Sequence, residues 1–146
     1  MAYTAELLVR EVVTVAPSEP ILEVARLMRR KHIGCVVVAE GGKIAGIFSE
    51  RDLVNRVVAE AVDPQQIPVS RVMTAAPVTV ESSEPLERVF AVLARRRFRH
   101  VPITKDGRPV GMVSLSDFVG VLGEVFSEER YVQYFADYFN QEASAR

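Results

Sequence analysis

The chain has 146 residues, of which 49% are hydrophobic and 25% charged, and its formal net charge is -1. This composition is typical of a soluble globular protein and argues against a general polyanion binder, so we do not expect nucleic acid as a partner. The single cysteine, Cys35, excludes an internal disulfide, and no stretch approaches the roughly 18 consecutive apolar residues of a membrane span. Because the first residues also lack the pattern of a secretory signal, we expect a cytoplasmic protein without a membrane segment.

The predicted elements begin with a short β-branched strand, VTV at 13–15, followed by the turn APSEP. Ser18 is a candidate helix N-cap, and Pro20 suits the first turn of a helix. Apolar residues then recur at helical spacing over 21–28 and lead into the basic segment RRKH, with which the helix ends. The sequence therefore predicts a strand and then a helix.

Two further strands are predicted at 35–38 and 44–48, separated by the turn EGGK. A second helix is predicted to begin at Ser49, where the sequence SERD places Asp52 three residues later. These elements complete the order β-α-β-β-α.

The same order occurs twice. Residues 78–119 align with residues 13–54 without a gap, and 14 of the 42 positions are identical, where unrelated stretches would share only about three. The segment VDPQQIP is the most loop-like part between the copies. We predict an α/β fold with a first repeat at 5–65, a second repeat at 70–125 and a C-terminal helix at 126–146.

Each copy ends in glycine, two apolar residues, serine, two variable residues and aspartate, as in GIFSERD and GMVSLSD. One explanation is structural: Ser49 and Ser114 cap helices, and Asp52 and Asp117 complete capping boxes. The other is functional, because a helix N-terminus attracts phosphate and a carboxylate one turn later can accept hydrogen bonds from both hydroxyls of a ribose. Both explanations stay open, although glutamate would cap equally well and the repeated aspartate favours a ligand.

The element order, the repeated GhhSxxD ending and the repeat length resemble a pair of CBS domains, the modules named after cystathionine β-synthase. The resemblance covers roughly residues 5 to 125. It implies two repeats packed sheet against sheet as a pseudo-twofold pair, the Bateman module. It also implies a regulatory, allosteric protein that is not an enzyme, and that binds AMP, ADP or ATP, with S-adenosylmethionine or NADH as further possibilities.

The resemblance further implies a homodimer formed through helices, and it allows a regulated protein partner that senses whether the nucleotide is bound. No cofactor and no metal are required on this interpretation. The identity of the nucleotide and of the regulated partner does not follow from the sequence.

The resemblance assigns residues to two clefts between the repeats. The first, called the Asp52 cleft below, takes Ser49, Asp52, Thr74, Val78, Arg99 and His100. The second, the Asp117 cleft, takes Ser114, Asp117, Val9, Val13, Gly34 and Cys35. Relatives often keep basic residues against phosphate at the positions of Arg99 and His100, whereas the first repeat has Gly34 and Cys35 there. A cleft without cations should hold phosphate less tightly, so we expect the Asp52 cleft to be the better nucleotide site.

Two alternative functions stay open. The protein could be a structural interaction module whose clefts are empty in the cell, or an enzyme that uses the thiol of Cys35. A cysteine at the start of an apolar strand is more often a small buried hydrophobe than a nucleophile. The basic runs RRK and RRR are typical of the last turn of a helix.

The C-terminal segment SEERYVQYFADYFNQEASAR lies outside the resemblance. Ser127 is its candidate N-cap, and five aromatic residues then recur on one helical stripe: Tyr131, Tyr134, Phe135, Tyr138 and Phe139. The stripe could pack on the chain's own repeats or on a second subunit. Because the segment continues from a helix of the kind through which relatives pair, we favour the second subunit.

Overall fold

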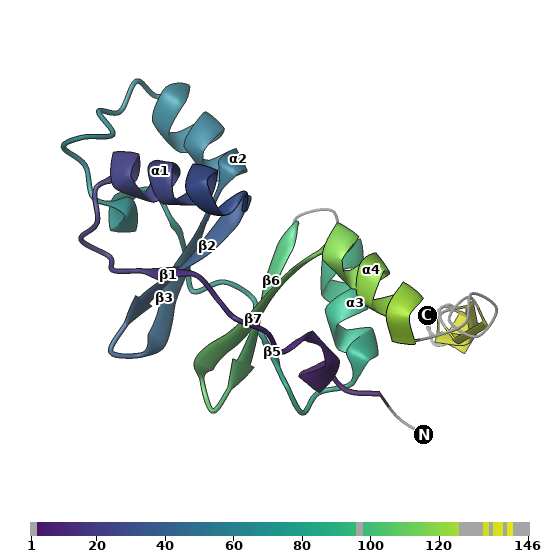
Figure 1. Ribbon diagram of the computed structural model, residues 1–146. Coiled ribbons are helices and arrows are strands. Elements are labelled where there is room, and N and C mark those ends of the chain that lie inside the picture. Colours follow the sequence, from purple (N-terminus) through teal and green to yellow (C-terminus); the bar gives the residue numbers. More distant parts are fainter. Residues whose placement is uncertain (1–2, 96–97, 126–132, 135, 139, 142–146) are drawn as a thin grey trace.

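The computed structural model describes residues 3–95, 98–125, 133–134, 136–138 and 140–141. Two lobes lie side by side, each with a small sheet covered by helices (Figure 1). The α/β class and the two β-α-β-β-α repeats predicted from the sequence are confirmed.

The first lobe carries a four-stranded sheet in the order β1-β2-β3-β4, in which β1 runs parallel to β2 and the other pairs are antiparallel. Its core contains Ile21, Val36 and Phe48, all nearly or fully inaccessible to solvent. Its elements are β1 (Thr14–Val15), α1 (Ile21–Lys31), β2 (Cys35–Glu40), β3 (Lys43–Ser49), α2 (Glu50–Asp52), the π-helix η2 (Leu53–Val58), the 3-10 helix η3 (Val69–Arg71) and β4 (Thr74–Ala75).

The second lobe repeats this arrangement with a three-stranded sheet in the order β5-β6-β7, and β5 is again parallel to its neighbour. Leu86, Val101 and Phe118 are fully buried in its core. Strand β7 also contacts β2 and β3 of the first lobe, so the two sheets meet between the repeats. The elements are β5 (Val80–Glu81), α3 (Leu86–Ala94), β6 (His100–Lys105), β7 (Arg108–Ser114) and α4 (Leu115–Val125).

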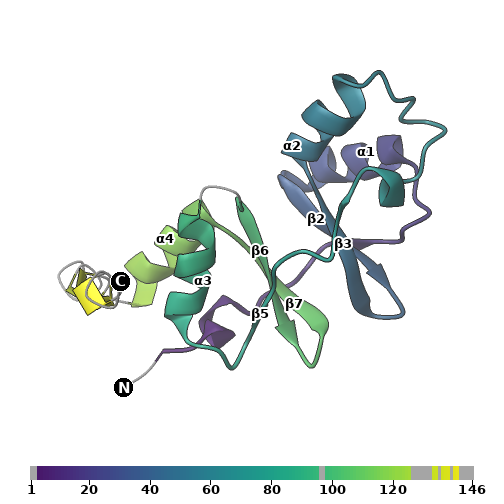
Figure 2. The ribbon, with the colours of Figure 1, turned by 180° about the vertical axis from the view of Figure 1, so that it is seen from behind.

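The chain crosses between the lobes twice, and both views show the two connections running between them (Figures 1 and 2). The N-terminal 3-10 helix η1 (Ala5–Leu8) packs in the core of the second lobe. The N–H of Arg10 donates to the carbonyl of Val110 at 2.8 Å. Conversely, Val69 and Val72 of the segment between the repeats belong to the core of the first lobe. The chain therefore completes the second lobe with residues that come before β1, and the first lobe with residues that come before β5.

The helix starts differ from the prediction at one point. Pro20, not Ser18, is the N-cap of α1, and Pro85 precedes α3 in the same way. The carbonyl of Pro20 accepts the N–H of Val24 at 3.2 Å, and the fixed φ of proline suits this position. The proposed serine cap is therefore wrong.

The helix that begins after Ser49 also differs from its counterpart in the second repeat. It starts as α2 and continues as the π-helix η2, where the N–H of Ala59 donates to the carbonyl of Val54, five residues earlier, at 2.9 Å. Helix α4 remains an α-helix throughout. The repeated sequence motif thus begins two helices of different geometry, and π-helical turns occur frequently at functional sites.

The described part of the C-terminal segment contacts the second lobe of its own chain. The ring of Tyr134 packs edge-on against Tyr3 at a centroid distance of 6.2 Å, and its hydroxyl donates to Glu87 of α3. Tyr134 and Tyr138 are half-buried. The predicted N-cap Ser127 and the aromatic residues Tyr131, Phe135 and Phe139 lie outside the described residues, so the dimer contact of this segment stays a prediction.

Within the ranges that the structure describes, none of the helices has the length and apolar character needed to cross a membrane.

Candidate functional site

The first serine–aspartate pair forms a capping box. The N–H of Ser49 donates to Oδ2 of Asp52 at 3.0 Å, and the N–H of Asp52 donates to the hydroxyl of Ser49 at 3.3 Å. The Ser49 hydroxyl also donates to Oδ2 of Asp52 at 3.1 Å. The structural explanation of the motif is therefore confirmed for the first repeat.

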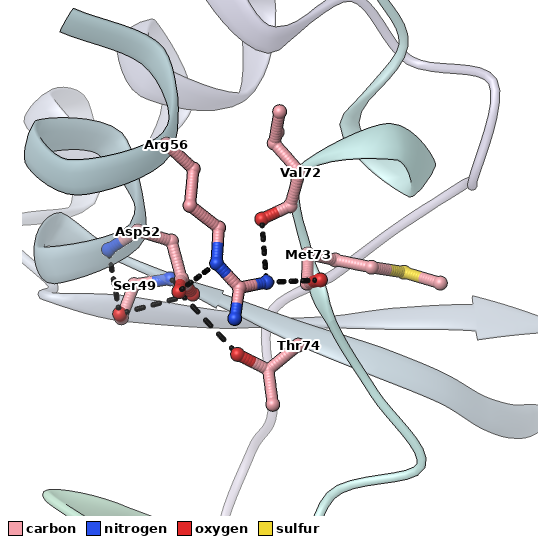
Figure 3. A network of polar contacts seen from close by, with 6 residues as sticks. All are labelled: Ser49, Asp52, Arg56, Val72, Met73 and Thr74. Atoms are coloured by element: carbon pink, nitrogen blue, oxygen red, sulfur yellow. Dashed lines mark hydrogen bonds and ion pairs between the residues drawn. The ribbon is translucent and has the colours of Figure 1, made fainter. Parts of the chain in front are cut away.

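The other oxygen of the Asp52 carboxylate faces two further elements (Figure 3). The hydroxyl of Thr74 in β4 donates to Oδ1 at 3.3 Å, and Nε of Arg56 in η2 lies 3.7 Å from the same oxygen. Nη1 of Arg56 donates in turn to the backbone carbonyls of Val72 and Met73, at 3.3 and 2.7 Å. Asp52 is only 9% exposed, and its carboxylate joins the motif to residues at the start of the second repeat.

A cavity of about 850 Å³ opens beside this network. Five of the six residues predicted for the Asp52 cleft line it: Ser49, Asp52, Thr74, Arg99 and His100. The last two come from the second lobe, so the cavity lies between the repeats. The sixth residue, Val78, is not among the residues of its wall and packs against the core of the second lobe.

Further residues of this wall were missed from the sequence, among them Arg51, Arg56 and Phe98. A sequence signal existed for two of them. Arg56 follows Asp52 by four residues, the spacing of an ion pair on one helix face. Phe98 directly precedes Arg99, which the prediction had already assigned to the cleft. The cavity therefore contains more arginines than the prediction included.

A second cavity, of about 350 Å³, corresponds to the Asp117 cleft. Its wall includes five of the six predicted residues, Val13, Gly34, Cys35, Ser114 and Asp117. The remaining one, Val9, is 41% exposed and lines neither cavity.

The expectation that the second cleft lacks cations is wrong. Arg10 lines it, together with His32 and His100. Arg10 belongs to the segment in which the chain crosses from the second lobe to the first, and this segment precedes the aligned repeat. A comparison of the two repeats position by position could therefore not reveal it.

The Asp117 carboxylate has fewer partners than the Asp52 carboxylate. The N–H of Ser114 donates to Oδ2 of Asp117 at 3.1 Å, and the N–H of Asp117 donates to the Ser114 hydroxyl at 3.2 Å. Val9 and Val121 stand where the first motif has Thr74 and Arg56. In the described residues, Asp117 is exposed and makes no side-chain contact comparable to the Arg56 and Thr74 contacts of Asp52. The two clefts therefore differ in size and in how firmly their aspartates are held.

His100 lines both cavities. Burial lowers the pKa of its imidazole below 6.5. The negative charge of Asp117, followed by that of Glu50, opposes this shift, the positive charge of Arg99 adds to it, and Asp52 opposes it weakly. His100 is therefore neutral at neutral pH and becomes protonated only in acid.

Replacing His100 by glutamine should make the stability of the protein less sensitive to acid. In the unfolded chain the histidine takes up its proton near pH 6.5, but in the folded chain only at lower pH. The unfolded state therefore binds more protons between these two values, and the contribution of His100 to stability, present above about pH 6.5, is lost as the pH falls through the folded pKa. Urea unfolding at about pH 7.5 and 5.5 measures the effect. Identical losses of unfolding free energy in the variant and the parent would contradict it.

The Cys35 thiol is a poor candidate nucleophile. The residue is 7% exposed, and burial, followed by the charge of Asp52, raises the pKa of its thiol to about 12. The reactive species of a cysteine is the thiolate, which is scarcely populated near neutral pH at such a pKa. This geometry disfavours a thiol enzyme.

The CBS domain family matches the chain twice, over residues 5–59 and 69–124. The chain is 32% identical over 117 residues to the CBS domain-containing protein YhcV of Bacillus subtilis (strain 168), covering 80% of this chain and 83% of YhcV. It spans between 15% and 58% of other curated relatives, which are longer proteins.

Solved structures agree with this assignment. The CBS-domain containing protein ATU1752 from Agrobacterium tumefaciens superposes with a TM-score of 0.71 at 36% identity, over 81% of this chain and 97% of that one. The CBS domain protein PAE2072 from Pyrobaculum aerophilum, complexed with AMP, superposes with a TM-score of 0.73 at 26% identity, over 90% of this chain and 96% of that one. With two matched copies that fill both lobes, the chain belongs to the CBS domain family and is a CBS pair.

Proposed function

We propose that this CBS pair is a regulatory module that binds an adenine nucleotide in the Asp52 cleft and signals its occupancy to a partner protein or to its own oligomer. The observation that carries the proposal is that two opposite charges from different lobes, the Asp52 carboxylate and the Arg99 guanidinium, line one cavity. The Asp52 carboxylate lies in the wall formed by the first lobe, and Arg99 and His100 lie in the wall formed by the second. The volume of this cavity, about 850 Å³, is within the usual range for small-molecule sites.

The chemistry of the two walls suits the two polar parts of a nucleotide. The hydroxyls of a ribose are donors, and the Asp52 carboxylate is an acceptor whose Oδ1 receives only one hydrogen bond from the described residues, the one from Thr74. The phosphate is an anion with several acceptor oxygens, which a guanidinium such as that of Arg99 binds with charge-assisted hydrogen bonds. A ligand bound between these walls would contact both lobes and could therefore favour one relative arrangement of them.

The AMP complex of PAE2072 supports an adenine nucleotide as the ligand class, because that protein has the same fold and 26% identity. The alternative of an interaction protein with empty clefts provides no reason for charged side chains from both lobes to converge on one cavity. The thiol-enzyme alternative is disfavoured by the high pKa of Cys35. The proposal does not choose among adenine nucleotides. The titration below therefore includes AMP, ADP, ATP, S-adenosylmethionine and NADH.

Isothermal titration of the full chain with AMP, ADP, ATP, S-adenosylmethionine and NADH tests the proposal. We expect saturable binding of at least one adenine nucleotide, accompanied by a higher melting temperature. GMP serves as the matched control, since it carries the same ribose and phosphate with a different base. If none of the five ligands produces binding heat or a shift in melting temperature, the result favours the empty-cleft alternative.

We also propose that the chain forms a homodimer through the helices that follow the two motifs. Large apolar side chains on these helices are exposed in the isolated chain: Val54 (58%) and Val58 (69%) on η2, and Leu115 (50%) and Val119 (57%) on α4. Val54 and Val119 occupy matching positions of the two repeats. Exposed apolar groups in matching positions suit a symmetric contact with a second copy.

Val119→Glu should convert the dimer to a folded monomer, because the substitution places an unpaired charge in an apolar contact. Light scattering should give about half the molar mass of the parent. Lys43→Glu, at the exposed start of β3, is a control that also introduces a glutamate on the surface. An unchanged mass for Val119→Glu would place the dimer contact elsewhere.

The predicted role of the C-terminal segment in the dimer is tested separately by deleting residues 126–146. A folded monomer would support that role. A deletion variant that remains a folded dimer would contradict it.

A further inference from the structure

The side chain of Arg56 connects two parts of the Asp52 cleft that are far apart in the sequence. At one end its Nε lies 3.7 Å from Oδ1 of Asp52, and at the other its Nη1 is bonded to the carbonyls of Val72 and Met73. We propose that Arg56 is a positioning residue for ribose recognition: it fixes the Asp52 carboxylate and the Thr74 hydroxyl relative to each other, so that Oδ1 faces the diol of the nucleotide. This inference rests on the proposed function.

The two oxygens of Asp52 have different tasks. Oδ2 accepts from both the N–H and the hydroxyl of Ser49 and is committed to the capping box. Oδ1 accepts a single, long hydrogen bond from Thr74 at 3.3 Å. The contact with Arg56 Nε, at 3.7 Å, is an ion pair beyond hydrogen-bond distance. It attracts the carboxylate without using one of its acceptor sites, and a carboxylate oxygen has about two of these. Oδ1 therefore keeps capacity for a hydroxyl donor.

At its other end Arg56 holds the backbone that carries Thr74. The bond from Nη1 to the Met73 carbonyl is short, at 2.7 Å. This backbone is also tightly packed on β3, since a Cβ placed on Gly46 would lie 2.6 Å from Sδ of Met73 and 2.7 Å from the carbonyl oxygen of Thr74. The threonine hydroxyl is consequently fixed from two sides. Removing the guanidinium leaves this packing and the pairing of β4 with β3 to set its place opposite Asp52.

The second repeat offers a comparison within the same chain. Val121 and Val9 occupy the positions of Arg56 and Thr74, and Asp117 is exposed rather than buried. The capping box is present in both copies, so Arg56 is not needed for capping. Its additional contacts distinguish the Asp52 cleft.

The test compares AMP with 2′,3′-dideoxy-AMP, which lacks both ribose hydroxyls but retains the base and the phosphate. Dissociation constants are measured by titration in full-length variants that also carry Asp117→Ala, so that the second cleft makes no diol contact. With Arg56 intact, AMP should bind at least about tenfold more tightly than the dideoxy analogue, the scale of a hydrogen bond to a charged group. In Arg56→Met this preference should fall to about twofold or less, mainly through weaker binding of AMP.

Arg51→Met is the matched control, because it removes the same charge from the same cavity and Arg51 makes no hydrogen bond or ion pair to Asp52 among the described residues. It should weaken AMP and the dideoxy analogue by the same factor and leave their ratio unchanged. Arg56→Lys, which retains the charge, should restore part of the preference. Since each ratio is taken within one variant, a partly unfolded sample lowers both affinities equally and does not change it.

The outcomes separate the inference from the proposed function. If the parent binds AMP but shows no preference over the dideoxy analogue, ribose recognition by Asp52 is wrong, and the role of Arg56 falls with it. If the parent shows the preference and Arg56→Met retains it in full, the inference is overturned while the proposed function stands. Should Arg56→Met fail to fold, Arg56→Gln keeps a donor for the carbonyls without the charge, and a retained preference in that variant would likewise overturn the role of the ion pair.

Discussion

Asp52→Ala is expected to weaken the binding of AMP by about 1.5–3 kcal/mol, or roughly 10- to 150-fold. The substitution removes a carboxylate that lines the larger cavity and accepts hydrogen bonds from Ser49 and Thr74. Isothermal titration gives the affinity directly. Asp117→Ala is the matched control in the second repeat and should reduce the affinity of the Asp52 cleft much less.

The same substitution should also lower the stability of the protein, because the capping box at Ser49 is lost with the carboxylate. The expected cost is about 0.5–2 kcal/mol of unfolding free energy. Melting curves recorded beside the titration separate the two effects. A lower melting temperature with unchanged affinity for AMP would reduce Asp52 to a structural residue and contradict its role in binding.

Arg99→Ala should weaken ATP and ADP by about 1.5–3 kcal/mol while affecting adenosine little. Arg99 lines the cavity from the second lobe and is exposed toward it. Of these ligands only the nucleotides carry phosphate for its guanidinium to bind. The difference between nucleotide and nucleoside therefore reports the phosphate contact itself.

Arg88→Ala is the control for the loss of a positive charge, since Arg88 of α3 pairs with Glu84, which precedes the helix, and lines neither cleft. It should leave all three affinities unchanged. Equal losses for ATP, ADP and adenosine in Arg99→Ala would indicate that Arg99 supports the fold of the second lobe, and its assignment to the phosphate would be wrong.

The sequence predicted the elements of both repeats because each short strand and helix carries a local pattern, and the 14 shared positions showed that the pattern occurs twice. It did not predict the cap of α1 correctly, because proline and serine are both acceptable near a helix start and Pro20 lies closer to it. The π-helix η2 was also missed. Arg56 of this helix contacts Val72 and Met73, which are distant in the sequence, and a local pattern does not reveal such contacts.

The sequence indicated residues that the structure brings to the cavity walls where they belong to the repeated motif, and it missed residues that the path of the chain through both lobes brings there. Ser49 and Asp52 could be identified from the four-residue motif SERD, because the hydrogen bonds between them are local. Arg10 enters the second cleft only because the N-terminal segment packs on the second lobe. The resemblance assigns Val78 to the Asp52 cleft, but its side chain packs against the core of the second lobe. Tertiary packing, which no local pattern encodes, places these residues.

The structure of the full chain crystallised with saturating AMP tests the central claim most directly. The account predicts one nucleotide between the lobes, its two ribose hydroxyls bonded to the Asp52 carboxylate and its phosphate facing Arg99 and His100. A complex in which AMP occupies only the Asp117 cleft, or in which the ribose makes no contact with Asp52, would contradict it.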